Sequence, residues 1–281
     1  RLTNELAQAR NALERQGERF ALQARRAVRR SPLGRYSPAS VRIAQEMERA
    51  ARARAPLVLL TPPGVPAEAY AASAHLQSDR CDGPFLLVDG ADPREHPMTH
   101  WLDQVTSPLL LAHGGTLVVL DLPALPADVQ RLLARFLVDP TSHDWRAAWL
   151  DAPASLDVFL IASVRETVDT LVVRGRLVED LANELGDRAL PLPSLASRPE
   201  DLRAIALDHL TRLGLALRGA PVGLADDALA LLVEHSWPLN DLELERLLYQ
   251  ALLRCKGPAL RAEDVAPWLP SEETIPRVFR G

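Results

Sequence analysis

The 281-residue sequence lacks any apolar run approaching the roughly 20 residues that a membrane-spanning helix needs, and its charged first stretch leads us to expect no secretory leader. It begins at Arg1 without an initiator methionine, and its first stretch is charged, so we expect an excised piece of a longer protein. The two cysteines, Cys81 and Cys255, are far apart and suit a reducing cytoplasm, with a lone disulfide as the alternative. The sequence predicts a cytoplasmic protein without a membrane partner.

The charge is distributed unevenly along the chain. Residues 1–35 hold nine Arg and three Glu, a balance of +6, so the formal charge of −5 leaves −11 for the remainder. Apolar residues recur at near-heptad spacing from Leu2 to Val28, which predicts a basic linker helix over 1–35. Such an arm can contact nucleic acid or anionic lipid, and a solvated linker helix is the plainer interpretation.

Short buried apolar runs alternate with helical segments, which predicts an α/β fold with a parallel sheet flanked by helices. The expected strands are 57–60, 85–88, 116–120, 158–162 and 189–192. Beyond Pro193 the pattern turns helical, with helices expected at 197–217, 225–235 and 240–255 and a short piece at 262–268. Ser37 before Pro38 predicts a helix N-cap, and Ser197 with Glu200 predicts a capping box. The helix that begins at Pro38 is expected to pack through Val41, Ile43, Ala44 and Met47.

One strand, turn and helix unit, from Gly114 to Leu137, carries a recognisable pattern, GGTLVVLDLPALPADVQRLLARFL. Its strand is apolar on both faces and ends at Asp121. Because ligands of open α/β sheets bind outside the carboxyl ends of the strands, Asp121 is a candidate metal ligand or catalytic group.

This unit resembles the second acidic motif of the AAA+ domain of bacterial sigma-54-dependent enhancer-binding regulators. Matches continue from about residue 36 to 268, at 75–85, 157–162, 179–201 and 237–244. The resemblance implies an AAA+ P-loop NTPase-like α/β subdomain at 36–194 and a C-terminal helical lid subdomain at 195–269. The N-terminal linker helix precedes them, and a flexible tail at 270–281 follows.

The phosphate-binding loop of that family falls on residues 61–68, TPPGVPAE, where Gly64 and Glu68 alone match. Such a loop needs glycines whose N–H groups wrap the phosphates and a lysine that reaches them. Here the lysine has become Ala67, and two glycines have become Thr61 and Pro66. Three prolines, at 62, 63 and 66, also remove N–H donors.

The other catalytic positions are changed as well. The register puts Leu120 in the place of the metal-binding aspartate and Asp121 in the place of the catalytic glutamate. Taking Asp121 as the metal ligand instead puts Leu122 in the catalytic place. The positions of the two trans arginines, the sensor arginine and the sensor asparagine hold, in that order, Val178, Glu184, Leu242 and Arg165. The segment between Phe85 and Gly114 lacks the family's sigma-contacting GAFTGA sequence.

These substitutions predict a catalytically degenerate AAA+ module, a pseudo-ATPase that serves as a scaffold for self-association, as a dimer or ring, or for an unidentified regulatory partner. No catalytic residue, metal or cofactor is expected, and the vestigial nucleotide pocket comprises Thr61, Gly64, Ala67, Glu68, Asp121, Arg165 and Leu242. One alternative is a divergent ATP·Mg-binding activator with Arg165 or Arg198 as the phosphate partner. Another is a regulator that contacts DNA through its basic arm or through a missing C-terminal domain.

Weaker candidates lie elsewhere. His96 and His100 could share a helix face and bind metal, but solvated histidines are the default interpretation. For His75 and His113 we expect core or loop roles. A tryptophan patch for a partner and plain burial are both open for Trp101, Trp145 and Trp149.

Overall fold

The computed structural model describes residues 22–53, 55–141, 155–186 and 189–269. Within these ranges the chain forms two compact units. The first contains the residues up to 30, 44–61 and 67–191, and the second contains 31–43, 62–66 and the residues from 192 onward. No helix among the described residues is both long and apolar enough to span a bilayer.

The first unit is built on a five-stranded sheet in the order β2-β3-β4-β1-β5. All four strand pairs are parallel. The strands are β1 (Leu57–Leu60), β2 (Phe85–Asp89), β3 (Gly115–Leu120), β4 (Val158–Val164) and β5 (Ala189–Pro191). Each expected strand is present, and the parallel α/β fold is confirmed.

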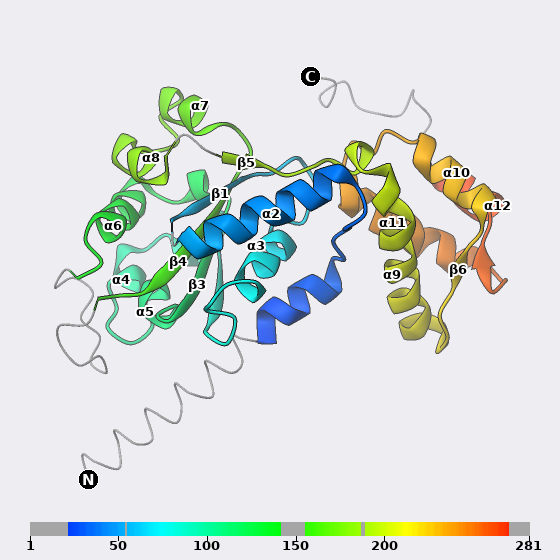
Figure 1. The fold of residues 1–281 in the computed structure, drawn as a ribbon, viewed down its shortest axis with the longest axis horizontal. Helices are drawn as coiled ribbons and strands as arrows, with labels where there is room; N and C mark the ends of the chain where they lie inside the picture. The colour runs from blue at the N-terminus through cyan, green and yellow to red at the C-terminus, as the bar shows by residue number, and fades with distance from the viewer. Residues whose placement is uncertain (1–21, 54, 142–154, 187–188, 270–281) are drawn as a thin grey trace, which may run out of the picture. The chain divides into compact units, whose positions relative to one another are not determined.

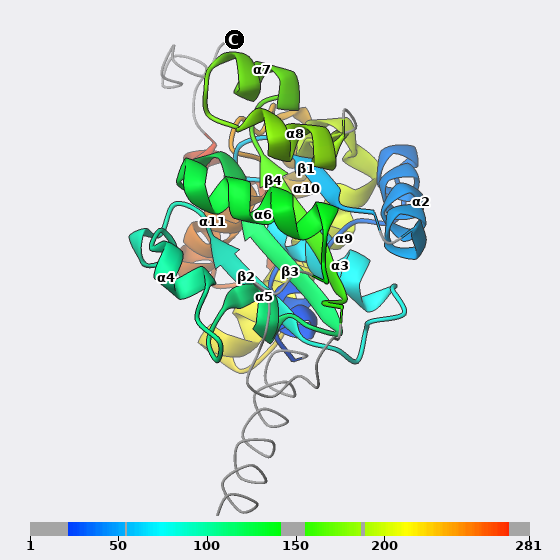
Figure 2. The same ribbon diagram turned by 90° about the vertical axis from the view of Figure 1, so that its left-hand side faces the viewer.

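Helices cover both faces of this sheet (Figures 1 and 2). The crossover through α3 runs across the sheet in the opposite direction to those through α6 and through α7 with α8, so right-handed connections place α3 on the other face. The helices are α2 (Pro38–Ala53, whose first residues belong to the second unit), α3 (Ala67–Leu76), α4 (Met98–Trp101), α5 (Pro108–Leu111), α6 (Ala127–Val138), α7 (Val168–Val173) and α8 (Glu179–Leu185). Residues 22–30 are also helical.

The predicted start of α2 is confirmed. Pro38 is its first residue, and the Ser37 hydroxyl accepts the Ser40 amide hydrogen at 3.0 Å. Ile43 and Met47 are buried as expected, but Val41 is 43% exposed, so its predicted packing role is wrong. Ala44 is half-buried, so the buried face of the helix runs through Ile43 and Met47, with Val41 outside it.

The second unit is a helical subdomain with its own hydrophobic core. It comprises α9 (Pro199–Arg218), α10 (Asp226–Glu234), α11 (Asn240–Arg254), α12 (Ala262–Val265) and a 3₁₀ turn, η5 (Ala266–Trp268). A short parallel pair, β6 (Gly223–Leu224) and β7 (Ala259–Leu260), lies beside them. The predicted lid helices are therefore present, with ends shifted by a residue or two.

The predicted capping box at Ser197 is wrong. Helix α9 starts at Pro199, its N-cap is Arg198, and no side chain caps it. The Ser197 hydroxyl instead donates to the Ser194 carbonyl at 2.7 Å, inside a 3₁₀ turn, η4 (Leu195–Ser197). Proline suits the first helical position because its missing N–H has no intrahelical partner there, and it moves the helix start two residues along.

Candidate functional site

In the first unit, the carboxyl ends of the parallel strands lie at one edge of the sheet and carry three of the candidate residues. Thr61 follows β1, Asp121 follows β3 and Arg165 follows β4. Thr61 and Asp121 are half-buried, whereas Arg165 is exposed. Ala67 and Glu68 open α3, where Ala67 is buried and Glu68 half-buried. The sheet therefore brings these strand ends to the edge where ligands of this fold class bind.

Asp121 has a left-handed backbone, with φ of 47° and ψ of 53°. Its amide donates to the Ser163 hydroxyl at 3.0 Å, and the amide of Gly90 donates to the Leu120 carbonyl at 2.8 Å. A Cβ on Gly90 would stand 2.6 Å from the Asp121 carbonyl oxygen. These close backbone contacts thus hold Asp121 in its strained left-handed conformation. Across the described ranges, no three His, Cys, Asp or Glu side chains gather as a metal site.

The loop at 61–66, all of which is described, offers very few amide hydrogens. Three of its six residues are prolines. The Thr61 amide donates to the Val164 carbonyl at 2.8 Å, and the Val65 amide closes a turn on the Pro62 carbonyl at 3.2 Å. The Gly64 amide is the remaining donor in this stretch.

Residues 62–66 belong to the second unit, where α11 holds the loop through its carbonyl groups. The Leu242 amide donates to the Gly64 carbonyl at 3.2 Å, and the Asn240 side chain donates to the Pro63 carbonyl at 2.8 Å. Gly64 has φ of +76°, and a Cβ there would stand 1.9 Å from the Leu239 carbonyl oxygen. The first turn of α11 therefore occupies the space directly against the loop. We call this contact the loop clamp.

Asn240 is the centre of the loop clamp. It is buried, has φ of +47° and accepts the Leu195 amide hydrogen on its Oδ1 at 2.7 Å. Trp237, three residues earlier, also has positive φ, at +53°, and its indole donates to the Leu232 carbonyl at 2.8 Å. Two left-handed non-glycine residues in one turn are uncommon and persist where surrounding contacts determine them. Sequence reasoning gave Asn240 no role, although the residue matched the family pattern.

Arg198 is fully buried, and its guanidinium pairs with Asp241 at 2.5 Å. Burial raises the pKa of the Asp241 carboxyl, while the charge and hydrogen bond of Arg198 act against that rise. If either group of such a pair is removed, the other charge stays buried without compensation, which is strongly destabilising. Arg198 is thus committed to α11 in the second unit, which argues against the expected alternative of a phosphate-binding arginine.

Asp201 fastens the segment at 36–40 to α9 in the second unit. Its carboxylate is buried and accepts hydrogen bonds from the amides of Tyr36 and Ser37, at 2.5 and 3.2 Å, and from the hydroxyls of Ser37 and Ser40, both at 2.7 Å. Burial acts to raise the pKa of Asp201, but these hydrogen bonds outweigh it and hold the pKa below its ordinary value. A Cβ on Gly34 would also collide with the Asp201 side chain, at 2.1 Å from its carboxyl carbon.

The two positions aligned with trans arginines differ in surroundings. Val178 is the N-cap of α8, and its amide donates to the Gln130 side chain at 2.9 Å. Glu184 is exposed on α8. Neither side chain supplies a positive charge.

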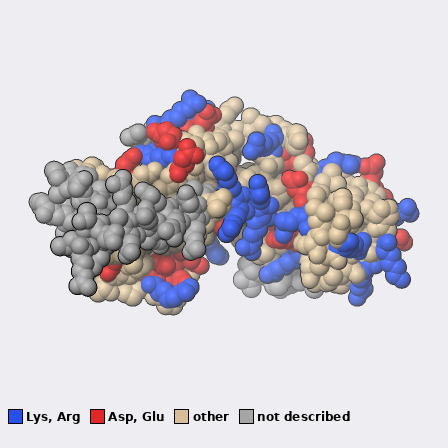
Figure 3. Space-filling model, turned by 90° about the horizontal axis from the view of Figure 1, so that it is seen from below, with Lys and Arg blue, Asp and Glu red and all other residues tan. Residues whose placement is uncertain are grey.

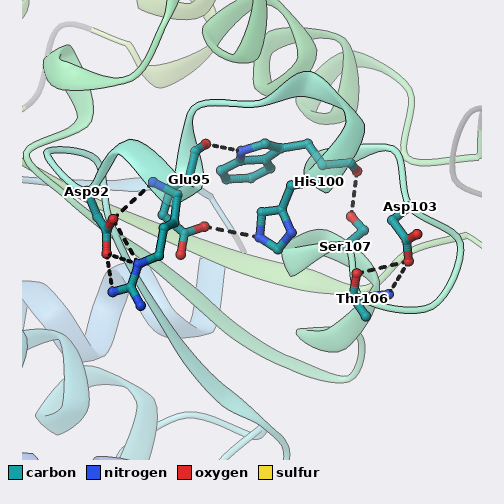
Figure 4. Close-up of polar contacts among 8 residues, drawn as sticks. Asp92, Glu95, His100, Asp103, Thr106 and Ser107 are labelled. Atoms are coloured by element: carbon teal, nitrogen blue, oxygen red, sulfur yellow. Dashed lines mark hydrogen bonds and ion pairs between the residues drawn. The ribbon is translucent and has the colours of Figure 1, made fainter.

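The segment between β2 and β3 holds itself together (Figure 4). The Trp101 indole donates to the Glu95 carbonyl at 2.7 Å, the Ser107 hydroxyl donates to the Trp101 carbonyl at 2.6 Å, and Asp103 accepts the Thr106 amide and hydroxyl hydrogens. Trp101 is 1% exposed, which confirms burial for this tryptophan, whereas Trp145 and Trp149 lie outside the described residues.

The histidines of this segment have separate partners. His96 Nε2 lies 2.9 Å from the Gly90 carbonyl oxygen, and His100 Nε2 lies 3.1 Å from the Glu95 carboxylate.

His75 and His113 occupy packing positions, as expected. His75 is buried, and its Nδ1 lies 2.9 Å from the Thr116 hydroxyl. Burial lowers its pKa to about 4, so it is neutral at pH 7. His113 Nδ1 accepts the Asp157 amide hydrogen at 3.2 Å. Cys81 and Cys255 are free thiols.

The sheet order and the helical second unit define the fold class, an AAA+ P-loop NTPase-like domain. Comparison with solved structures agrees: NtrX from Brucella abortus in complex with ATP superposes with a TM-score of 0.71 at 26% identity, over 89% of this chain and 60% of that one.

Comparison of sequences identifies the group of relatives. The chain is 28% identical over 276 residues to the transcriptional regulatory protein XylR of Pseudomonas putida, covering 90% of this chain and 48% of XylR. It is 27% identical over 242 residues to the Sigma54-dependent transcriptional activator SfnR of the same species, covering 81% of this chain and 65% of SfnR. No family model matches. The chain is thus similar over most of its length to bacterial transcriptional regulatory proteins, of which SfnR is described as Sigma54-dependent, and it spans about half the length of several curated relatives it matches.

Proposed function

We propose that this chain is a catalytically degenerate AAA+ module of a sigma-54-activator-like transcriptional regulator, which acts as a scaffold without hydrolysing ATP. The observation that carries the proposal is the loop clamp. A nucleotide-binding loop turns its N–H groups toward the phosphates. In this chain the loop retains a single uncommitted N–H, at Gly64, and its carbonyl groups at 63 and 64 are bonded to α11.

The loop at 61–68 also contains no positively charged side chain. The sequence contains one lysine, Lys256, which stands 14 residues beyond Leu242, just past the end of α11. At 1.5 Å per helical residue this separation is about 20 Å, too far for a side chain to span. Arg198 is buried in its ion pair with Asp241. The residues present therefore do not fit ATP and Mg²⁺, and no catalytic step is assigned through them.

Titration calorimetry of the whole chain with ATP tests this proposal, with and without Mg²⁺. We expect no saturable binding up to about 1 mM, the range where the binding free energy falls to roughly 4 kcal/mol. Micromolar affinity that depends on Mg²⁺ would overturn the proposal and favour a divergent ATP-binding activator. Arg165, exposed at the end of β4, would then be the first phosphate partner to examine.

The substitution Ala67→Lys provides a sharper version of the same test. It restores the missing charge but neither the N–H groups lost to proline nor the loop's freedom from α11. We expect the variant to remain unable to bind ATP, because charge without a cradle of amides does not position a triphosphate. Restored ATP binding would show that the missing lysine alone accounts for the lack of nucleotide binding.

The scaffold part of the proposal concerns self-association or the binding of a regulatory partner. Two separate hydrophobic cores remain well packed although the catalytic groups are substituted. In sedimentation experiments, we expect a distribution of oligomers that does not respond to ATP. An ATP-dependent shift toward larger assemblies would contradict this expectation.

A further inference from the structure

The helical segment at 22–30 in the first unit presents an unusually basic face. Its four arginines, at 25, 26, 29 and 30, are all exposed, and the segment contains no acidic residue. Their spacing of one and four residues places them within about 140° around the helix axis. In Figure 3 this segment appears as the blue cluster near the centre of the view. The face is thus continuous and fixed on a packed helix.

The opposite face of the same helix is already used for packing. Ala24 and Ala27 are 0% and 4% exposed. These small residues allow the helix to lie close against its neighbours, and its orientation presents the arginines to solvent. The face is therefore fixed by the fold rather than carried on a free arm.

No intramolecular ion pair neutralises these arginines among the residues that the structure describes. On α2, by contrast, Arg49 and Arg52 pair with Glu46 and Glu48. The reason is visible in the sequence: residues 19–45 contain seven arginines and no Asp or Glu. A concentration of like charge costs free energy through repulsion unless an anionic partner relieves it.

We propose that the arginine face of residues 22–30 binds the phosphate backbone of double-stranded DNA without reading its sequence. Guanidinium groups form paired hydrogen bonds with phosphate oxygens, and four of them on one rigid helix match a closely spaced line of phosphates. This inference rests on the proposed function only for its choice of DNA as the polyanion, since the relatives carry the names of transcriptional regulators.

The burial pattern favours a nucleic acid over a lipid surface. A helix that lies in a membrane interface exposes a large apolar face beside its basic one. Here the apolar face is buried, and within residues 22–30 Leu22 is the one large apolar side chain that is substantially exposed, at 46%. The exposed surface of this segment is therefore dominated by charge.

Fluorescence anisotropy with a random-sequence duplex tests the proposal on the whole chain at several salt concentrations. The variant carries Arg→Gln at 25, 26, 29 and 30. The matched control carries Arg→Gln at four exposed arginines elsewhere, Arg131, Arg176, Arg246 and Arg261. Both variants change the net charge equally, so they separate the position of the charges from their sum, and circular dichroism verifies that each is folded.

Four phosphate contacts contribute about −3.6 to the slope of log affinity against log salt. We expect the helix variant to lose that contribution and to bind about 10³-fold more weakly at 0.15 M salt, with a much smaller effect in the control. Equal losses in both variants would overturn the proposal, as would unchanged binding in the helix variant. Tighter binding to vesicles containing anionic lipid than to DNA would also overturn it. ATP is absent throughout, so the outcome is independent of the nucleotide test above.

Discussion

The carboxylate of Asp201 organises the junction between the segment at 36–40 and α9, and removing it gives the most informative prediction for stability. Asp201→Ala deprives four donors of their shared acceptor. The two serine hydroxyls can rotate toward other acceptors, but the amides of Tyr36 and Ser37 are fixed by the backbone. Each polar group left buried without a partner costs about 1–3 kcal/mol, so we expect a loss of about 2–5 kcal/mol.

Hydrogen exchange with mass spectrometry measures this loss locally. The amides at 36–41 should exchange faster in Asp201→Ala, while those of β3 and β4 in the first unit should change little. Asp208→Ala is the matched control, because Asp208 lies on the same helix, is exposed, and removes the same charge. Urea unfolding gives the accompanying free energy. Unchanged exchange at 36–41, or equal effects of the two substitutions, would refute the assignment of Asp201 as the anchor.

The pH dependence of the same anchor has a defined sign. The pKa of Asp201 is lower in the folded protein than in the unfolded chain, so its contribution is fully present above the unfolded pKa and is lost as pH falls through the folded one. The protection factors of the amides at 36–41, taken relative to the intrinsic exchange rate at each pH, should therefore fall in acid, and this fall should be absent from Asp201→Asn.

Three further predictions concern the second unit. Burial lowers the pKa of His209 to about 4, so stability should fall by up to about 1.4 kcal/mol per pH unit from pH 6.5 toward 4, and urea unfolding of His209→Gln should show a shallower slope. Asn240→Gly keeps the left-handed backbone but deletes the side-chain bonds of the loop clamp; we expect faster hydrogen exchange at Leu195 without any gain of ATP binding. Arg198→Met should cost about 3–5 kcal/mol by leaving Asp241 buried alone, and adding Asp241→Leu should recover most of that loss in a double-mutant cycle.

Local sequence patterns were sufficient for the sheet. Strands such as β3 and β4 are buried on both faces and read as continuous apolar runs, so their existence and parallel direction follow from pattern and connectivity, whereas their order in the sheet was not predicted. The capping box at Ser197 failed for a local reason, because Pro199 is a stronger start for α9 than a serine two residues before it.

The loop clamp was beyond sequence reasoning. Asn240 and Pro63 are 177 residues apart, and no local pattern reports a contact at that separation. The sequence did locate the loop and its missing donors, because prolines and the absent lysine are visible directly. It could not show that the carbonyl groups of the loop are bonded to α11, nor that Arg198 and Asp201 have intramolecular partners. The one available signal in the sequence was the asparagine shortly after Trp237 and Pro238, since asparagine tolerates positive φ better than most residues.

The order in which the chain contributes to its two units affects how the protein can be divided. The polypeptide passes from one unit to the other five times, at 30/31, 43/44, 61/62, 66/67 and 191/192. A fragment cloned from residue 192 onward would contain every lid helix yet would lack both short segments that Asp201 and Asn240 bind. Such a fragment would leave these polar side chains facing water in place of their partners, so dissection of this protein calls for point substitutions rather than truncation.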